Sequence, residues 1–285
     1  MGRSEAAGHR RSGVTRFAQI FRCGQQDEFF RQVGTHLRAL FQSSVAMVHC
    51  SFMRVPYLDL QIPVGRVVAR VVRRMPRSTV LPILSGPGRG SRWIARACEA
   101  NSWYGTYERA KIGRLVKMLR PDTVFFDLGA NAGYYSVVAA PRCRQVYAFE
   151  PLPESLGYLR RHIALNQLVN CTAIEAAVGD FDGPVHFSKS FTKYEGQVCK
   201  DGELNVVSVK LDTFCRTHPA PALLKIDVEG AELAVLRGAE HLLTEYRPAI
   251  FLATHSDELD KQCRSFLIER GYELEELEPG EWIAT

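Results

Sequence analysis

The sequence predicts an α/β fold in which a mostly parallel, doubly wound sheet is covered by helices on both faces. From residue 123 onward, short apolar runs alternate with segments of helical periodicity, which is the pattern of strand–helix–strand units. The apolar runs are nearly continuous, as expected for strands buried on both faces. The chain has 285 residues, of which 46% are hydrophobic and 24% charged, and this composition is sufficient for a large core.

The N-terminal part differs from the rest. Residues 1–26 are rich in arginine and show no periodicity, so we expect a mobile tail, with a transit peptide as the alternative. Apolar residues at near-helical spacing over 27–48 and 63–74 predict helices. We therefore divide the chain into a basic, partly helical extension (1–78) and a main domain (79–285).

The main domain is expected to open with a strand, a glycine turn and a second strand over 80–94, followed by a helix over 105–119. Further strands are predicted at 123–127, 145–149, 172–178, 222–227 and 248–254. Helices are predicted between and after them, at 132–140, 153–166, 231–244 and 257–270. The segment 181–210 interrupts the alternation with two strands around a polar loop, and the last residues suggest an antiparallel pair that closes the sheet.

The charge is unevenly distributed. Residues 1–90 contain 14 arginines, no lysine and four acidic residues, a net charge of +10, which leaves −5 for residues 91–285. In residues 63–74 arginines alternate with valines, so this segment is expected either to pack on its own domain or to contact an anionic membrane peripherally. The eight cysteines stand singly and no apolar run reaches the roughly 18 residues of a membrane helix, which favours reduced thiols and a cytoplasmic protein.

Two predicted strand ends carry the pattern of a nucleoside cofactor site. The first strand runs through Asp127 into a turn with Gly129 and Gly133 that precedes a helix, where we expect room and free N–H groups for a ligand. The next strand ends at Glu150, followed by Pro151, and a carboxylate there can accept hydrogen bonds from ribose hydroxyls. The two signals are weak separately and specific together.

The spacing of the turn distinguishes among cofactors. The dinucleotide pattern G-x-G-x-x-G would fall on Gly129, Asn131 and Tyr134, and the last two residues argue against NAD or FAD. A phosphate-binding G-x-x-x-x-G-K-[ST] loop is absent. The observed D-x-G-x-N-x-G resembles the first motif of S-adenosylmethionine-dependent methyltransferases.

Five segments carry a more specific resemblance: Gly105-Thr106-Tyr107-Glu108, Phe126 to Tyr135, Phe149-Glu150-Pro151, Ala177-Val178-Gly179-Asp180 and Lys225-Ile226-Asp227-Val228-Glu229-Gly230-Ala231-Glu232. Through them, residues 79–277 resemble the FkbM family of class I S-adenosylmethionine-dependent methyltransferases. The resemblance implies a Rossmann-like, seven-stranded sheet and S-adenosyl-L-methionine as cofactor. It also implies O-methylation of a hydroxyl on a sugar, polyketide-like or other small acceptor.

The resemblance also implies roles for individual residues. The turn would face the methionine moiety of the cofactor, and Asp127 would contact the amino group of that moiety. Glu150 would bind the ribose, and Ala177 would lie near the adenine. The full cofactor-binding set is Asp127, Gly129, Ala130, Asn131, Gly133, Glu150, Pro151, Ala177 and Glu108.

The catalytic candidates are Asp227, Glu229 and His255. Asp227 and Glu229 would share a face if their strand continued that far, which would permit a general base or a hard-cation site. No metal ligand is assigned, although a divalent metal is compatible with these residues. Ala253 stands where the family often has an acidic residue, so a cofactor-binding scaffold without turnover is an alternative.

Two further alternatives remain open. The basic first 90 residues motivate an RNA or protein methyltransferase, and strong salt dependence of substrate binding would support the nucleic acid. Nucleic acid is not the expected partner, because the Asn/Asp-Pro-Pro-aromatic signature of amino-methylating enzymes is absent. A dehydrogenase is the more remote alternative. The sequence assigns neither the acceptor nor the oligomeric state.

Overall fold

The computed structural model describes residues 74–98, 100–189, 196–198 and 204–285. The predicted tail and the helix at 27–48 lie outside these residues, as does all but the last residue of the helix at 63–74. The boundary at residue 78 and the membrane contact of the basic extension therefore stay predictions. Within the described ranges, the helices are too short or too polar to traverse a bilayer.

The centre of the fold is a seven-stranded sheet with the order β12-β13-β11-β10-β3-β4-β5. Five strands are mutually parallel, and β13 and β12 close one edge as an antiparallel pair. The strands are β3 (Val124–Leu128), β4 (Gln145–Phe149), β5 (Cys171–Ile174), β10 (Leu223–Ile226), β11 (Ala249–Ala253), β12 (Leu274–Glu278) and β13 (Glu281–Ala284). The predicted doubly wound, seven-stranded sheet is thereby confirmed.

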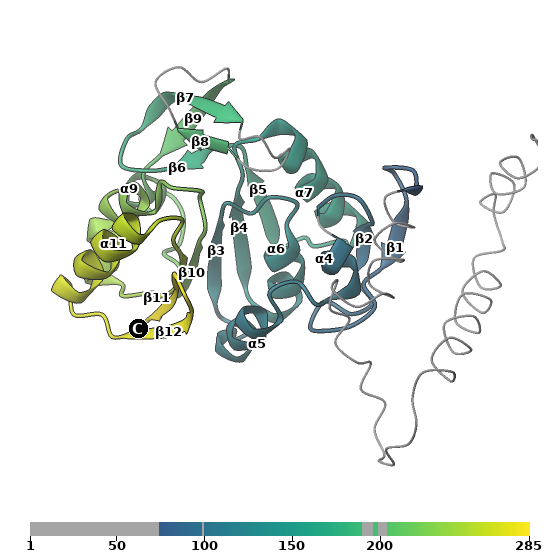
Figure 1. Ribbon diagram of the computed structural model, residues 1–285, viewed down its shortest axis with the longest axis horizontal. Coiled ribbons are helices and arrows are strands. Elements are labelled where there is room, and N and C mark those ends of the chain that lie inside the picture. Colours follow the sequence, from purple (N-terminus) through teal and green to yellow (C-terminus); the bar gives the residue numbers. More distant parts are fainter. Residues whose placement is uncertain (1–73, 99, 190–195, 199–203) are drawn as a thin grey trace, which may run out of the picture. The chain divides into compact units, whose positions relative to one another are not determined.

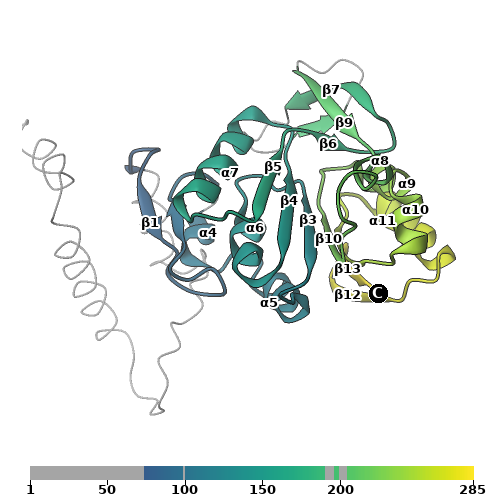
Figure 2. The ribbon, with the colours of Figure 1, turned by 180° about the vertical axis from the view of Figure 1, so that it is seen from behind.

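Helices cover both faces of this sheet (Figures 1 and 2). One core cluster includes Phe125 with residues of α5 (Arg109–Met118), α6 (Tyr134–Ala139) and α7 (Pro153–Leu165). A second cluster includes the next strand residue, Phe126, with residues of the opposite helical layer. That layer contains α8 (Leu211–Phe214), α9 (Glu232–Arg237), α10 (Glu240–Glu245) and α11 (Asp257–Glu269). Successive strand residues point to opposite faces, so an apolar residue at every position is needed to fill both cores.

Two smaller sheets flank the main one. β1 (Val80–Pro82) and β2 (Arg92–Ile94) form the antiparallel pair expected near the start of the domain, followed by α4 (Ala100–Tyr104). The described part of the interrupting segment 181–210 contains three strands where two were predicted, and with β6 just before it they form a four-stranded sheet of order β6-β9-β7-β8. Its strands are β6 (Ala177–Val178), β7 (Gly183–Lys189), β8 (Gly196–Val198) and β9 (Leu204–Val209).

The predicted strand at 172–178 is wrong in its length. It ends at Ile174 as β5, and the residues after it form β6, which pairs in parallel with β9 of the smaller sheet. The physical reason is a change of partner, since the chain leaves β4 and joins a strand that lies far along the sequence.

The single helix predicted at 231–244 is also wrong, because it is divided into α9 and α10 near Gly238. A Cβ at Gly238 would lie 1.9 Å from the carbonyl oxygen of Gly179, so the backbones meet there. The Asp212 carboxylate then accepts hydrogen bonds from the backbone N–H groups of His241 and Leu242, at 3.0 and 2.8 Å. Capping of these otherwise unpaired groups stabilises the start of a new helix.

The β1–β2 pair is attached to the glycine turn through the buried His162. Its Nε2 accepts a hydrogen bond from Ile94 N–H (2.9 Å), and its Nδ1 donates to the carbonyl of Ala132 (2.7 Å). The imidazole also stacks on Trp93 with ring centroids 3.8 Å apart. Burial lowers the pKa of His162 to about 4, so the ring is neutral and can serve both partners.

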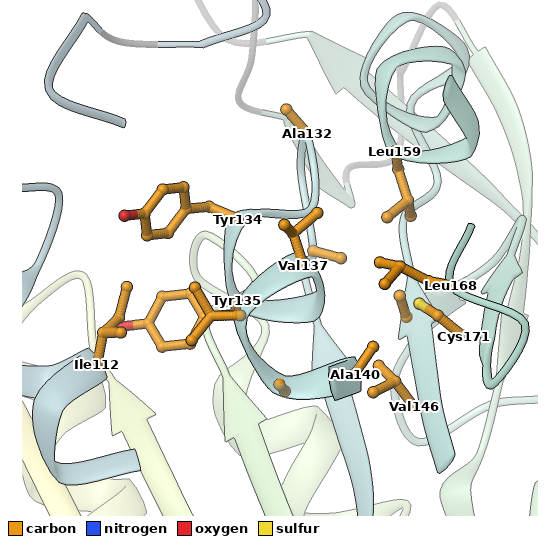
Figure 3. Packing of buried hydrophobic residues seen from close by; sticks show 14 of the residues in the cluster. Ile112, Ala132, Tyr134, Tyr135, Val137, Ala140, Val146, Leu159, Leu168 and Cys171 are labelled. Atoms are coloured by element: carbon orange, nitrogen blue, oxygen red, sulfur yellow. The ribbon is translucent and has the colours of Figure 1, made fainter. Parts of the chain in front are cut away.

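The core beneath the turn is built around α6. Figure 3 shows Tyr134 and Tyr135 extending from this helix, with Tyr135 toward Ile112 of α5. Val137 lies on the side of Leu159, which comes from α7. The six-residue helix is therefore buried all round and places the preceding turn rigidly at the end of β3.

Candidate active site

The carboxyl ends of β10, β3 and β4 lie side by side. From β3 the strand order continues through β4 and β5 on one side and through β10 and β11 on the other, so the order reverses direction at β3. The backbone N–H groups of Gly129 and Ala130 both donate to the carbonyl of Phe149, at 3.1 and 2.9 Å. On the other side, Asp227 N–H donates to the carbonyl of Leu128 (3.3 Å). Such a switch point is where ligands bind in open α/β sheets.

The glycines of the turn face the protein itself. Gly129 has φ +72°, and a Cβ there would lie 1.9 Å from the carbonyl oxygen of Asp227. Gly133 has φ +88°, and a Cβ would lie 2.5 Å from Leu159 Cδ1. The expectation that a missing Cβ makes room for a ligand is wrong at these two positions, because the neighbouring strand and helix occupy that room.

The expectation of free N–H groups is wrong at four positions of the turn as well. Gly129, Ala130, Asn131 and Gly133 each donate their backbone N–H to an acceptor within the protein. A ligand of the turn must therefore bind through groups other than these four N–H groups.

Glu150 follows β4 directly and fastens the turn. Its Oε2 accepts from Asn131 N–H and its Oε1 from Leu152 N–H, both at 2.8 Å. Only 5% of the residue is exposed, and burial raises its pKa to about 7 although the two N–H groups oppose the shift. A carboxylate has about four acceptor positions, so two remain for a ligand.

Asp127 is fully buried in β3 and is held from within. Ser136 Oγ donates to its Oδ2 at 2.7 Å, and Lys225 Nζ lies 3.5 Å from its Oδ1. Burial raises the pKa of Asp127, against the lowering effect of the Lys225 ammonium. Its Oδ1 has no hydrogen-bond partner among the described residues, and contact with the amino group of a cofactor stays a prediction.

Lys225 connects the turn to the next strand end, and sequence reasoning gave it no role. Its ammonium lies 2.9 Å from the carbonyl oxygen of Gly129 and 3.4 Å from Asp227 Oδ2. The side chain is 8% exposed, so this charge is compensated almost entirely by protein groups. A lysine inside the apolar run of β10 is a signal that could have identified it, because buried lysines require partners.

A small, narrow cleft lies beside Asp227. It is lined by Glu108, Lys111, Tyr135, Lys225, Ile226, Asp227, Phe251, Leu252, Ala253 and Trp282. Glu108 accepts a hydrogen bond from the Tyr135 hydroxyl and pairs with Lys111 at 2.9 Å. It therefore lies in the cleft with Asp227.

An acidic residue does reach this region despite Ala253. Glu281 of β13 is the register partner of Ala253, and its Oε1 lies 2.6 Å from Lys111 Nζ. The sequence offered no indication of this, because the pairing joins residues that are far apart along the chain.

The three catalytic candidates come together at the ends of β10 and β11. His255 Nε2 lies 3.4 Å from Asp227 Oδ1 and 3.3 Å from Glu229 Oε2. β10 ends at Ile226 and Glu229 has φ +56°, so a continuing strand does not align the two carboxylates as predicted. A tight turn and the histidine bring them together instead.

Glu232 holds His255 on the side of the ring away from Asp227 and Glu229. Its side chain is fully buried, and its Oε1 accepts from His255 Nδ1 (2.9 Å) and from the N–H groups of Val228 and Gly230. The hydrogen bond to Glu232, with the nearby Glu229 and Asp227 carboxylates, raises the pKa of His255 to about 9 against partial burial. Burial alone would raise the pKa of Asp227, but the charges of Lys225 and His255 outweigh it and hold that pKa below normal.

The two remaining predicted residues are Pro151 and Ala177. Pro151 is half-buried and follows Glu150 directly. Ala177 is buried in β6, where it pairs with Ser208 of the four-stranded sheet. The structure thus forms one group around the turn and Glu150 and another around Asp227, whereas Ala177 belongs to a separate sheet.

A doubly wound sheet with a glycine turn and a carboxylate at adjacent strand ends defines the class of nucleotide-cofactor-binding α/β proteins. Residues 127–274 match the family described as "Methyltransferase FkbM domain", and the chain belongs to this family. The matched range includes the turn, Glu150, Asp227 and His255.

Several known methyltransferases are similar to this chain. The hexuronic acid methyltransferase AglP of Haloferax volcanii is 28% identical over 142 residues, covering 48% of this chain and 58% of AglP. The 2-O-methyltransferase NoeI of Sinorhizobium fredii is 26% identical over 161 residues, covering 47% of this chain and 65% of NoeI. The chain thus spans about three-fifths of the length of these relatives. A crystal structure of an FkbM methyltransferase from Methylobacillus flagellatus aligns with a TM-score of 0.45 and 20% identity, over 59% of this chain and 45% of that one.

Proposed function

We propose that the protein is an S-adenosylmethionine-dependent O-methyltransferase that acts on a hydroxyl group of a small, sugar-like acceptor. The observation that carries this proposal is Glu150, a nearly buried carboxylate at the switch point of an FkbM-family fold. The relatives support the acceptor class, since NoeI is a 2-O-methyltransferase and AglP acts on hexuronic acid.

The residues around the turn fit such a cofactor. Glu150 retains acceptor positions that suit the two hydroxyls of a ribose. The side-chain oxygen of Asn131 is buried and has no hydrogen-bond partner among the described residues, so it can accept a bond from a ligand's amino or hydroxyl group. Glu150 and Asn131 would therefore hold the nucleoside end and the neighbouring polar groups of S-adenosylmethionine.

Bound S-adenosylmethionine supplies a methyl group on a positively charged sulfur, a strong electrophile that an acceptor oxygen can attack. The chain's task is to position that oxygen and to take its proton. Asp227 lines the cleft and is kept ionised by Lys225, so it can accept a hydrogen bond from an acceptor hydroxyl and then its proton. Trp282 and Tyr135 line the same cleft, and their rings provide apolar surface next to Asp227 for an acceptor.

Calorimetry with S-adenosylhomocysteine tests the cofactor site. We expect Glu150→Ala to weaken binding by about 1–3 kcal/mol, roughly 5- to 150-fold, the usual size for hydrogen bonds to a charged group. The matched control is Glu154→Ala, an exposed glutamate in the first turn of α7, for which the affinity should not change. Equal affinity for wild type and Glu150→Ala would refute the site.

Turnover is tested separately. Wild-type protein is incubated with methyl-labelled S-adenosylmethionine and a panel of hexuronic acids and neutral sugars, and labelled product is measured. Binding of the cofactor without product across the panel would favour a scaffold without turnover over the proposed enzyme.

A further inference from the structure

The side chains of Asp227, Glu229 and His255 converge on one point beside the cleft. One ligand atom from each, two carboxylate oxygens and an imidazole nitrogen, lie within 4.8 Å of one another. The three come from two loops, after β10 and after β11, so the grouping is produced by the fold. Two oxygens and one nitrogen are a donor set that suits divalent metal ions.

A second observation comes from Glu232, which lies beneath the group and is fully buried. Its Oε1 faces His255 Nδ1, and its Oε2 has no hydrogen-bond partner in the part of the chain that the structure describes. A carboxylate at Nδ1 orients the ring so that Nε2 faces the other two carboxylates, an arrangement that commonly supports metal-binding histidines. The described residues thus supply no hydrogen-bond donor for this buried oxygen, which is costly for a polar atom.

The charges point the same way. Three carboxylates, those of Asp227, Glu229 and Glu232, surround one imidazole. Lys225 lies near Asp227, but it also serves the buried Asp127. A divalent ion would compensate more of this negative charge than a proton on the histidine can.

We propose that Asp227, Glu229 and His255 bind a divalent transition-metal ion, with Glu232 as the residue that orients the histidine. The nitrogen ligand favours ions such as Mn²⁺ or Zn²⁺ over Ca²⁺, which takes oxygen ligands. Three protein ligands leave coordination positions open for an oxygen of the acceptor or for water.

The assignment of a role rests on the proposed function. Asp227 belongs both to the metal ligands and to the cleft, so an ion held there would lie next to a bound acceptor and could hold its hydroxyl oxygen. The carboxylate of Asp227 can divide these tasks, because Oδ1 faces His255 while Oδ2 lies beside Lys225.

Titration with Mn²⁺ tests the proposal. The full-length chain is stripped with EDTA, the chelator is removed, and free Mn²⁺ is followed by its electron paramagnetic resonance signal. We expect one Mn²⁺ to bind per chain and Glu229→Gln to weaken it at least about tenfold, with Glu232→Gln about 10- to 100-fold weaker. Glu245→Gln, an exposed glutamate on α10, is the matched control and should bind as wild type does.

Thermal unfolding of each variant shows whether it is folded. Glu229 is 34% exposed, so Glu229→Gln should fold. Its Mn²⁺ affinity tests the proposed site even if Glu232→Gln does not fold. Absence of Mn²⁺ binding to wild type would overturn the proposal in favour of a protonated His255 as the cation of the group. Binding that Glu229→Gln and Glu245→Gln leave equally unchanged would also overturn it.

The same samples separate this proposal from the proposed function. S-adenosylhomocysteine binding to the stripped wild-type protein depends on Glu150 and the turn. If it persists while Mn²⁺ fails to bind, only the metal site is refuted. If Mn²⁺ binds as expected and S-adenosylhomocysteine does not, the metal site stands and the cofactor assignment falls.

Discussion

The carboxyl ends of β3 and β4 lie at the same sheet edge as those of β10 and β11, but the polar side chains at the two places differ in burial and in hydrogen bonding. At β3 and β4, Asp127 is fully buried, Glu150 is 5% exposed, and both carboxylates are held by hydrogen bonds within the protein. At β10 and β11, Glu229 and His255 are 34% and 31% exposed, and carboxylates outnumber cations. Lys225 lies between the two regions and contacts both.

The ends of β3 and β4 therefore form a rigid framework, whereas the ends of β10 and β11 present accessible, charged side chains. The first region gains rigidity, because nearly every turn N–H has a fixed acceptor, and rigid elements hold a ligand most precisely. The second region keeps charge accessible next to the cleft, where an acceptor, a proton or a metal ion can use it. We therefore expect substitutions in the turn of the first region to affect mainly stability and those at Glu150 to affect cofactor binding. Substitutions in the second region should affect mainly pH dependence and the binding of an acceptor or a metal ion.

The largest effect is expected at Gly129. Gly129→Ala would place a Cβ 1.9 Å from a backbone oxygen of Asp227, the residue after β10, at a φ of +72° that alanine rarely adopts. Since backbone atoms cannot move aside cheaply, we expect a loss of about 4 kcal/mol or more in the free energy of unfolding, measured by urea denaturation.

Gly157→Ala in α7 is the matched control. A Cβ at this position would point into open space, and alanine favours a helix, so a gain of about 0.5–1 kcal/mol is expected. Similar effects at the two glycines would contradict the rigid framework at the turn.

The next largest effect is expected at Lys225. Lys225→Met leaves the buried Asp127 without its cation, and breaking such a pair typically costs about 3–5 kcal/mol. The loss is measured by urea denaturation, and the exposed Lys117→Met provides the control. Adding Asp127→Asn to Lys225→Met should restore part of the loss, and a double variant less stable than Lys225→Met would argue against the charge explanation.

The smallest effect concerns the pH dependence caused by His255. In EDTA, its pKa of about 9 in the folded chain exceeds the usual 6.5, so the folded state binds the proton more tightly. The resulting stabilisation is complete below about pH 6.5 and is lost as the pH rises through about 9. Because the side chain is partly exposed, we expect about 1–2 kcal/mol, as the difference between wild-type and His255→Gln unfolding free energies at pH 6.5 and 9.5. A difference that does not change with pH would show that His255 is no more basic than a free histidine.

Much of the fold follows from local pattern. The strand predicted at 145–149 coincides with β4, and the helix predicted at 153–166 differs from α7 by one residue. Both are long or strongly apolar segments with clear ends, which is where periodicity is most informative. The errors at Ile174 and Gly238 fall where the chain changes its partner or where two backbones meet, and neither event leaves a periodic signal. The helix predicted at 105–119 begins only at Arg109, because Glu108 before it has φ +40°.

For the candidate site, the positions of the residues could be predicted from the sequence, but their environments could not. Asp127, Glu150 and Asp227 were expected at strand ends, and they lie at neighbouring ends because parallel strands bring their carboxyl ends to one edge. Their environments were not predictable. Asp127 accepts a hydrogen bond from Ser136, and Glu150 accepts one from the backbone of the turn. These contacts arise only when the side chains pack in three dimensions.

Periodicity and motif spacing are local properties of the chain, and they were enough to predict the doubly wound sheet, the FkbM resemblance and which carboxylates stand at strand ends. The three-dimensional arrangement was needed to show which of those carboxylates are buried and which are accessible. It was also needed to show that Lys225 joins two strand ends and that Glu232 orients His255 toward Asp227 and Glu229. Burial and charge pairing depend on residues brought together from distant parts of the chain, and spacing along the sequence does not contain that information.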